Sequence, residues 1–358
     1  MSKFAIILIN YKGYARKFLS DCLQSLNKQT VPRNEYEIIV VDNAADEESR
    51  EYLKTFSDIK IIERPDGNYC AGNNAGIKYA LQNGAQYVVI LNMDVEVKPE
   101  WLAELKIGLK KNPQCGILQS KILLFPKNEQ EKKHPLLNTI GNKINFLGFG
   151  FTDNYRVPES KVVFAEDYPL ISGYASGCSF ITTKEVLQKI GDYDEELYMY
   201  HDDLDLSARA RLAGYEIRLA PKSVLFHKYE FSRSNQMIFH MEKNRALTFL
   251  TMYSLPTMMI LFPIFLLFEL AMLFYSFVNG WFEKKKEIYK YFFKKSTWRH
   301  VFAKRRIIKK LKTIKEKEFI RDIKGGIYFQ EIDNPLLKYL GNPFFEMYWY
   351  LIKFLIIW

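Results

Sequence analysis

The chain has 358 residues, which is enough for one large α/β domain with an accessory region or for two ordinary domains. Hydrophobic residues make up 48% and aromatic residues 15% of the sequence, so the composition argues against disorder or a coiled coil and favours a membrane-facing surface as well as a core. Four scattered cysteines without a CxxC pair indicate neither a zinc site nor a disulfide framework, and they fit a reducing cytoplasm.

Continuous apolar runs alternate with helical patterns in the first 112 residues. We expect strands at 5–9, 37–41, 60–63 and 87–91, and helices at 15–28, 47–56, 74–83 and 100–111. Runs of this kind are typical of strands buried on both faces of a parallel, doubly wound sheet, where ligands bind beyond the carboxyl ends of the strands. This rule selects Asn10, Tyr11, Asp42, Asn43, Asp66 and residues 92–94 before any motif is considered.

The middle of the chain gives a weaker pattern. From 115 to 168 the runs are broken by Lys, Asn, Pro and Gly, and we expect loops over the ligand-binding face. Order returns between 172 and 229, where strands are expected at GCSFITT, IRLAP and VLFH, and helices at KEVLQKIG and DLDLSARARLAG.

The last third of the chain is apolar and basic. Residues 249–282 contain one charge, Glu269, and are too short for two membrane spans. A single crossing would separate the following basic block from a cytoplasmic N-terminal domain, against the positive-inside rule. We therefore expect a bent, monotopic or re-entrant pair of helices, and a surface-lying helix at 343–358. Core helices of an ordinary second domain are the alternative.

Between residues 283 and 324 there are seventeen Lys or Arg and five Asp or Glu, whereas the rest of the chain has 34 basic and 36 acidic residues. A basic block beside an apolar segment favours anionic lipid headgroups over nucleic acid as the partner. A solvated helical face is the plain alternative. We expect two domains, at 1–245 and at 246–358.

Carboxylates at strand ends suggest a cation and a nucleoside site. Asn92 and Asp94 lie two residues apart after a strong strand, so both can turn toward one hard cation that bridges phosphate oxygens. His227 closes another strand and can complete the metal shell. Asp42 can accept from a nucleobase or ribose. Each residue also has a purely structural alternative: Asp94 as a turn residue, His227 as a surface residue and Asp42 as a helix N-cap.

Three further carboxylates, Asp202, Asp203 and Asp205, lie at one expected helix start. Acidic residues in a first turn are commonly partners of the helix dipole, so one of the three is expected to be structural. Three carboxylates within four residues are more than helix capping requires. One of them, close to a diphosphate and metal, is a candidate general base.

Taken in order, seven motifs carry a resemblance: ILINY, VVDN, PDGNYCAGNNAGI, LNMDVEV, SGCSFIT, GDYDEELYMYHDDLDLSARARLAGY and VLFHKYEFSRS. Together the sequence resembles the family 2 inverting glycosyltransferases, in particular the rhamnosyltransferase-like branch of cell-surface polysaccharide assembly. The resemblance covers residues 3 to about 245. It implies an α/β GT-A fold with a Rossmann-like, mostly parallel sheet, here followed by a membrane-associated helical region.

The resemblance also implies roles for individual residues. Asp203 corresponds to the family's catalytic base and Asp202 to its acidic neighbour, while Asp94 and His227 correspond to metal positions for Mg²⁺ or Mn²⁺. Gly177 and Arg233 are the candidates for contact with the acceptor. Donor binding falls to Asn10, Tyr11, Asp42, Asn43, Asp66, Asn73, Asn74, Asn92 and Met93.

The chain departs from the family's usual pattern at four places. The family usually has Glu at Asp202, an aromatic residue at His201 and Asn-x-Gly at Asp66 to Asn68, and the first position of the DxD-like motif is Asn92 here. The turn after the first strand lacks the glycine-rich signatures of a nucleotidyltransferase or a dinucleotide-dependent oxidoreductase.

We therefore expect an enzyme at the cytoplasmic face of a membrane, which transfers sugar from a nucleotide-sugar donor to a glycan or lipid-linked acceptor and does not bind nucleic acid. A catalytically inactive transferase-like membrane scaffold is the alternative.

Overall fold

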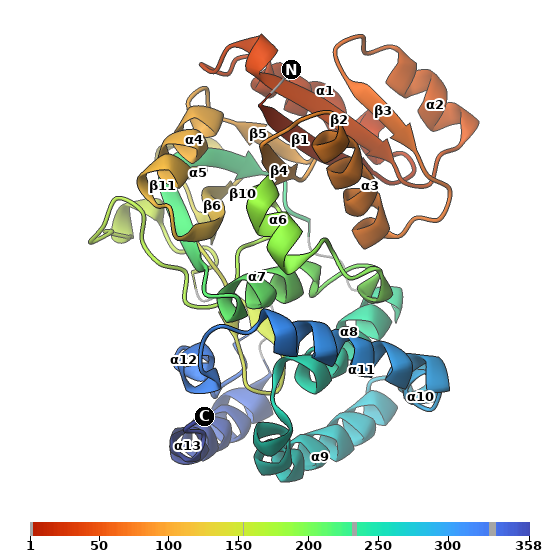
Figure 1. The fold of residues 1–358 in the computed structure, drawn as a ribbon, viewed down its shortest axis with the longest axis vertical. Coiled ribbons are helices and arrows are strands. Elements are labelled where there is room, and N and C mark those ends of the chain that lie inside the picture. The colour runs from red at the N-terminus through yellow and green to blue at the C-terminus, as the bar shows by residue number, and fades with distance from the viewer. Residues whose placement is uncertain (1–2, 153, 231–234, 329–333) are drawn as a thin grey trace. The chain divides into compact units, whose positions relative to one another are not determined.

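The computed structural model describes residues 3–152, 154–230, 235–328 and 334–358, which form two compact units (Figure 1). Unit 1 comprises Met1–Asn142, Thr152–Arg211 and Tyr215–Glu230; unit 2 comprises Lys143–Phe151, Leu212–Gly214 and Phe231–Trp358. This division concerns packing, and the boundary at residue 245 between a catalytic and a membrane-associated domain stays a prediction.

A nine-stranded mixed sheet forms the centre of unit 1, in the order β3-β2-β1-β4-β10-β6-β11-β5, with β7 paired to β6. The strands β3, β2, β1 and β4 are parallel, as expected from their apolar runs, whereas β10 is antiparallel to both of its neighbours. The strands are β1 (Phe4–Asn10), β2 (Tyr36–Asp42), β3 (Lys60–Glu63), β4 (Tyr87–Leu91), β5 (Val95–Val97), β6 (Cys115–Leu124), β7 (Leu137–Thr139), β10 (Ser179–Thr183) and β11 (Glu216–His227).

Helices accompany this sheet, at the expected places except for α5, which lies in the segment where loops were expected. They are α1 (Tyr14–Leu26), α2 (Glu47–Lys54), α3 (Tyr69–Gln82), α4 (Trp101–Lys111), α5 (Glu129–Lys133), α6 (Lys184–Ile190) and α7 (Asp202–Leu212). The helix expected to begin at residue 74 begins at Tyr69, because the Asn68 side chain accepts from the Ala71 N–H at 3.1 Å and so caps the first turn.

The expectation of loops from residue 115 was wrong at its start. Residues 115–124 form β6, a central strand that is buried along most of its length. Its polar pair, Gln119 and Ser120, interrupts the apolar run but is buried with hydrogen-bond partners: the Ser120 hydroxyl lies 2.8 Å from Trp101 Nε1 and 3.0 Å from the Ser223 hydroxyl. The strands expected at IRLAP and VLFH are one strand, β11, with a register shift between Ala220 and Val224.

Unit 2 is mainly helical. Its elements are β8 (Lys143–Ile144), β9 (Gly150–Phe151), α8 (Asn235–Met252), α9 (Leu255–Val278), α10 (Phe282–Phe292), α11 (Lys295–Leu311), α12 (Glu316–Ile320) and α13 (Asn342–Ile352). Its core includes Phe146 stacked on Trp349, with ring centroids 5.3 Å apart.

The apolar segment expected as a pair of helices contains one long helix, α9, which continues through Pro263. Among the described residues, α9 alone is long and apolar enough to cross a membrane by length and composition. Only 22% of its most apolar window is buried.

Candidate active site

The ends of the first two strands are joined by buried polar groups. Asn10 lies opposite Asp42 in the parallel register, and its Nδ2 donates to Asp42 Oδ1 at 2.7 Å. The other carboxylate oxygen of Asp42 accepts from the Ser49 hydroxyl at 2.6 Å, and Asn10 Oδ1 accepts from the Ala15 N–H at 2.8 Å. Both side chains are fully buried, so in this structure they fix β1, β2 and the following helices in place.

Exposed groups lie beside this buried pair. Tyr11 is 44% exposed, and its ring lies so close to Gly67 that a Cβ there would come within 2.9 Å of the ring. Gly67 also has a φ of +70°, which favours glycine. The exposed Asp66 pairs with Arg64 at 2.7 Å. The ring of Tyr11 is thus partly accessible, with Lys12 Nζ 5.2 Å from its centroid, and Asp66 is held by Arg64.

The start of α3 approaches the same strand ends. A Cβ at Gly72 would lie 3.0 Å from the side chain of Asn43, so a larger residue there would press on Asn43. Asn43 Oδ1 and Asn73 Oδ1 are buried without a hydrogen-bond partner among the described residues. Asn74, in contrast, is satisfied: it donates to Tyr193 O at 2.9 Å and accepts from the Tyr193 N–H at 2.9 Å. The two unpaired amide oxygens are the stronger candidates for ligand contact.

Asp94 and His227 lie together, as the sequence predicted. The register pairs His227 with Val95 across β11 and β5, and His227 Nε2 lies 3.2 Å from Asp94 Oδ1. Both side chains are buried. The contact is an ion pair rather than an aligned hydrogen bond, because Asp94 Oδ1 has no hydrogen-bond partner among the described residues.

Asn138 determines how the imidazole faces this carboxylate. His227 Nδ1 lies 2.7 Å from Asn138 Oδ1, so the ring donates there and turns Nε2 toward Asp94. Burial opposes protonation of His227, but Cys178 and then Asp94 raise its pKa to about 10. Burial likewise works against ionised Asp94, yet His227 and the Tyr14 hydroxyl hold its pKa below the usual value.

These two residues fit a divalent cation. A carboxylate oxygen without a hydrogen bond and an imidazole nitrogen face each other, which is favourable when a proton or a metal ion lies between them. No group of three or more His, Cys, Asp or Glu that could hold a metal occurs in the described part of the chain. Two protein ligands nevertheless suit an ion such as Mg²⁺ that takes further oxygens from a bound diphosphate.

Backbone contacts connect this pair to the acidic helix start. The Asn92 N–H, which follows β4, donates to Cys178 O at 2.8 Å. The neighbouring Gly177 N–H donates to Asp203 Oδ2 at 2.9 Å, and the Leu204 N–H donates to Asp203 Oδ1 at 2.8 Å. Met93, which lies between Asn92 and Asp94 in the sequence, is buried in the hydrophobic core. The ends of β4 and β10 therefore bring both groups of carboxylates to one edge of the sheet.

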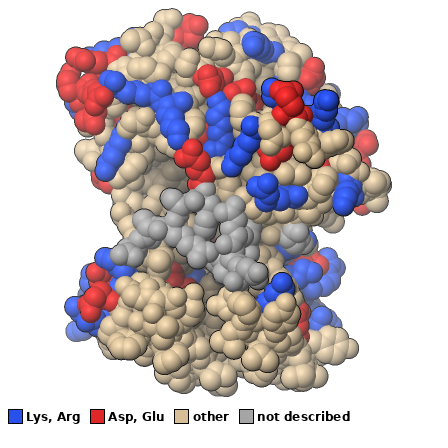
Figure 2. All heavy atoms as spheres, turned by 180° about the vertical axis from the view of Figure 1, so that it is seen from behind, with Lys and Arg blue, Asp and Glu red and all other residues tan. Residues whose placement is uncertain are grey.

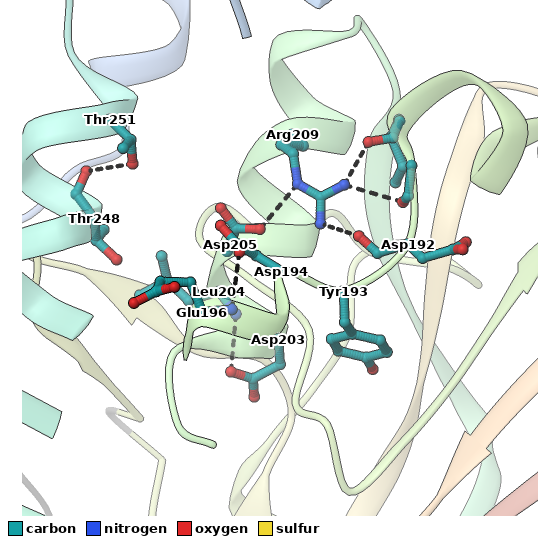
Figure 3. A network of polar contacts seen from close by, with 12 residues as sticks. Asp192, Tyr193, Asp194, Glu196, Asp203, Leu204, Asp205, Arg209, Thr248 and Thr251 are labelled. Carbon is teal, nitrogen blue, oxygen red and sulfur yellow. Dashed lines mark hydrogen bonds and ion pairs between the residues drawn. The ribbon is translucent and has the colours of Figure 1, made fainter. Parts of the chain in front are cut away.

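The carboxylates of α7 have different surroundings, and Figure 3 shows two of them, Asp203 and Asp205. Asp205 accepts from Arg209 Nε at 2.9 Å, and the same guanidinium donates to Gly191 O at 3.0 Å and Asp192 O at 2.7 Å. Asp205 is thus the structural member that the sequence led us to expect. Asp203 is partly exposed and points away from Arg209, whereas Asp202 is buried.

Burial raises the pKa of Asp203 to about 6, although the N–H groups of Gly177 and Leu204 favour its ionised form. Burial and then the charge of Asp203 raise the pKa of Asp202 further. The two neighbouring carboxyls therefore oppose each other's ionisation, and the two N–H donors favour the negative charge on Asp203.

The segment before α7 is held in an unusual backbone conformation. Tyr198, Tyr200 and His201 have φ values of +68°, +66° and +62°. Left-handed conformations are costly for residues with side chains and tend to occur at functional sites. The Tyr198 carbonyl accepts from the Cys70 N–H at 3.1 Å, which ties the segment to the start of α3.

The sequence analysis missed Asn138 and Tyr14. Asn138 lies in the segment that we expected to be loops, and no motif marked it. Tyr14 opens the helix after β1, where aromatic residues are common in any core. Arg233 lies outside the described residues.

The mixed sheet flanked by helices has the architecture of the GT-A fold of glycosyltransferases. A solved structure of GalNAc-T7 with UDP, GalNAc and Mn²⁺ shares this fold: the match has a TM-score of 0.51 and 15% identity, and it covers 68% of this chain and 48% of that one.

Residues 5–190 match Glycosyl transferase family 2, and the chain belongs to this family. It is 24% identical over 222 residues to the low-salt glycan biosynthesis hexosyltransferase Agl10 of Haloferax volcanii, covering 61% of this chain and 64% of that one. It is 22% identical over 192 residues to the dTDP-rhamnosyl transferase RfbF of Shigella flexneri, covering 53% and 59%. The chain thus spans less than two thirds of each relative.

Proposed function

We propose that the protein is an inverting glycosyltransferase, which moves a sugar from a nucleotide-diphosphate sugar to an acceptor hydroxyl in glycan or polysaccharide biosynthesis. The observation that carries this proposal is the position of Asp203. Its partly exposed carboxylate is oriented by two backbone N–H donors, and the chain links it through Gly177 and Cys178 to the strand end that bears Asp94.

Asp203 acts as the general base in this proposal. It takes the proton of the acceptor hydroxyl as the acceptor oxygen bonds to the anomeric carbon, and the nucleoside diphosphate leaves from the opposite face with the electron pair of the broken bond. One displacement of this kind inverts the anomeric centre. Asp202 remains protonated and keeps a second negative charge away from the site.

Asp94 and His227, with Asn92 beside them, would hold a divalent cation, Mg²⁺ or Mn²⁺. Such an ion, when bound, neutralises charge on the departing diphosphate. The protein supplies one carboxylate oxygen without a hydrogen bond and one imidazole nitrogen at this place. Asn138 and Tyr14 then act as positioning residues, because they orient the imidazole and contact the carboxylate.

The donor is proposed to lie along the ends of β1, β2 and β4. Tyr11 stacks on the base, and the unpaired Asn43 and Asn73 oxygens accept hydrogen bonds from donor hydroxyls or amides. Three other predicted donor residues contribute indirectly: Asn10 and Asp42 hold the two strand ends, and Asn74 holds the segment at Tyr193.

Acceptor and location are proposed together. The acceptor is a glycan or lipid-linked precursor that passes Gly177, and the protein works at the cytoplasmic face of the cell membrane on an anionic surface. Arg233, outside the described residues, stays a predicted acceptor contact. The basic block at 283–324 and the apolar helix α9 support this placement.

A panel of UDP-, GDP- and dTDP-sugars with Mg²⁺ or Mn²⁺ tests the proposal. The true donor at a hundred times its Kd should add about 2.7 kcal/mol to stability. In a transfer assay with that donor, NMR of the product should show the inverted anomer. A retained configuration would refute the mechanism, and the absence of stabilisation by any nucleotide sugar would favour the inactive scaffold.

A further inference from the structure

One side of α9 is apolar and exposed along its whole length. The exposed positions recur every three or four residues, which places them on one side of a helix. Their exposures range from 47% to 75%, at Leu255, Met259, Phe262, Leu266, Leu270 and Phe274.

The C-terminal helix lies beside α9 and adds a second apolar side. Tyr348 donates to the Ile260 carbonyl at 3.1 Å, the Trp358 indole donates to the Ser254 hydroxyl at 2.9 Å, and Phe268 packs against Phe345 with centroids 5.9 Å apart. Around α13 the exposed apolar residues include Leu340, Met347, Leu351, Phe354 and Leu355. We call the exposed residues of α9 and of the α13 region the apolar surface. In Figure 2 the lower part of the molecule shows a broad area of uncharged residues.

Lysines border this surface with their chains over aromatic rings. Lys338 lies 5.4 Å from the ring of Tyr339, and Lys353 lies 5.6 Å from that of Tyr350. Lys286 lies 5.4 Å from the ring of Phe282 just after α9, and it also pairs with Glu283 at 2.7 Å. Lysine and aromatic residues at an apolar edge are typical of proteins at a lipid–water interface, where the ammonium reaches the headgroups.

The inner side of α9 is tied to the rest of unit 2 by charge. Glu269, the one charged residue of the helix, accepts from Lys285 Nζ at 2.9 Å and pairs with Arg245. Arg245 and Lys285 are each about 1% exposed, and both also contact Glu242. Withdrawing α9 to span a bilayer would carry Glu269 away from both cations and leave the buried Arg245 and Lys285 with Glu242 as their one remaining carboxylate in this cluster, which is strongly unfavourable.

We infer that unit 2 docks on the surface of an anionic phospholipid leaflet, with α9 lying parallel to the membrane plane and the apolar surface in contact with lipid, and that α9 does not cross the bilayer. This inference gives the proposed membrane association a mode and a set of contact residues. It can be tested without sugar transfer, so its failure and the failure of the proposed enzyme activity are separate results.

The bordering lysines favour a lipid leaflet over a second copy of the chain. Two copies joined through this surface would bring like charges together at its edge, whereas anionic headgroups complement them. A dimer that forms in aqueous buffer through the apolar surface and does not bind vesicles would overturn the inference.

The first experiment measures how deeply three positions of α9 lie in the lipid bilayer. The four native cysteines are buried, so single cysteines introduced by Met259→Cys, Leu266→Cys and Phe274→Cys can carry a fluorescent probe in the full-length chain. With vesicles containing anionic lipid and nitroxides at a shallow or a deep position, a helix parallel to the membrane gives the same shallow depth at all three sites. A probe at 266 that lies deep, between shallow probes at 259 and 274, would show a crossing helix and overturn the inference.

The second experiment measures binding by vesicle co-sedimentation at low salt. Phe262→Glu and Phe274→Glu should each weaken binding to anionic vesicles at least tenfold, since each places a charge on the apolar surface. Val163→Glu is the matched control, because Val163 is 91% exposed in unit 1 and its change should leave binding unaltered. Equal loss in the control, or no loss in the two α9 variants, would overturn the inference; circular dichroism confirms that each variant is folded.

Discussion

Two regions of the molecule bury charged side chains, and they do so in opposite ways. In unit 2, Glu242 and Glu269 are matched by Arg245 and Lys285, so the four charges cancel. In unit 1, Asp202 and Asp203 stand next to each other, and the nearby Arg209 is committed to Asp205. A balanced cluster resembles a structural support, whereas an unbalanced pair keeps a carboxylate reactive at a cost in stability.

The sharpest test of this contrast is Asp203→Asn. The amide keeps the shape but removes the basic oxygen, so turnover should fall by about 10² to 10⁴ while donor affinity stays nearly unchanged. Steady-state kinetics and donor titration on the same variant separate the two effects. Asp205→Asn in the same turn serves as the control, with lower stability through Arg209 and no comparable loss of turnover in the folded fraction. Near-normal turnover in Asp203→Asn would contradict the base assignment.

Asp94 is another buried carboxylate of unit 1, and it is partly compensated by His227. Asp94→Ala should weaken metal-dependent donor binding more than about 100-fold. Loss of a residue that merely orients a metal ligand costs about 10- to 100-fold in metal affinity, and loss of the ligand itself should cost more. Calorimetric titration of the donor with and without Mn²⁺ measures this. Glu96→Ala is the control, since Glu96 pairs with Lys228 at 2.8 Å. Full activity of stripped wild-type protein in excess EDTA would reject a metal role.

In the balanced cluster, Glu269→Gln should lower the stability of unit 2 by about 3 to 5 kcal/mol, because it leaves Arg245 and Lys285 with only Glu242. Differential scanning calorimetry or local hydrogen exchange in α8 to α10 would report the loss. Adding Lys285→Met should recover part of it. Glu283→Gln, at an exposed pair with Lys286, should change little. If Glu269→Gln behaves like the control, the cluster is not a support.

The smallest effect concerns pH. Turnover needs ionised Asp203, so it should fall about tenfold per unit as pH drops below the Asp203 pKa of about 6.

The stability of the folded protein should change with pH in the opposite direction. Because the pKa is raised on folding, the native state binds more protons than the unfolded state between the ordinary carboxyl pKa and 6, and stability decreases as pH rises through that window. Asp202→Asn should reduce this decrease, and pH-dependent denaturant melts would detect it.

The sequence predicted the parallel half of the sheet because its strands are apolar on both faces. It failed at β6, since Gln119 and Ser120 look like surface residues until their hydrogen bonds with distant segments are known. Apolar periodicity carries no information about such partners. The same limit hid the length of α9, where Pro263 suggested a break that the helix tolerates.

At the site, strand-end position was enough to bring Asp94 and His227 together, and local crowding marked Asp202 and Asp203. The sequence could not show that Asp42 uses both oxygens inside the protein or that Asn138 orients the imidazole. Asn10 and Asp42 are 32 positions apart in the sequence, and Asn138 and His227 are 89 positions apart. Only the folded chain brings each pair together.

The left-handed residues Tyr198, Tyr200 and His201 have a consequence for evolution in the laboratory. Each such residue costs on the order of 1–3 kcal/mol, so selection for heat resistance alone would reward glycine or a relaxed backbone in this segment. The same changes would loosen the approach to the carboxylates of α7. A thermostable variant selected without an activity screen should therefore accumulate substitutions at 198–201 and lose catalysis as it gains stability.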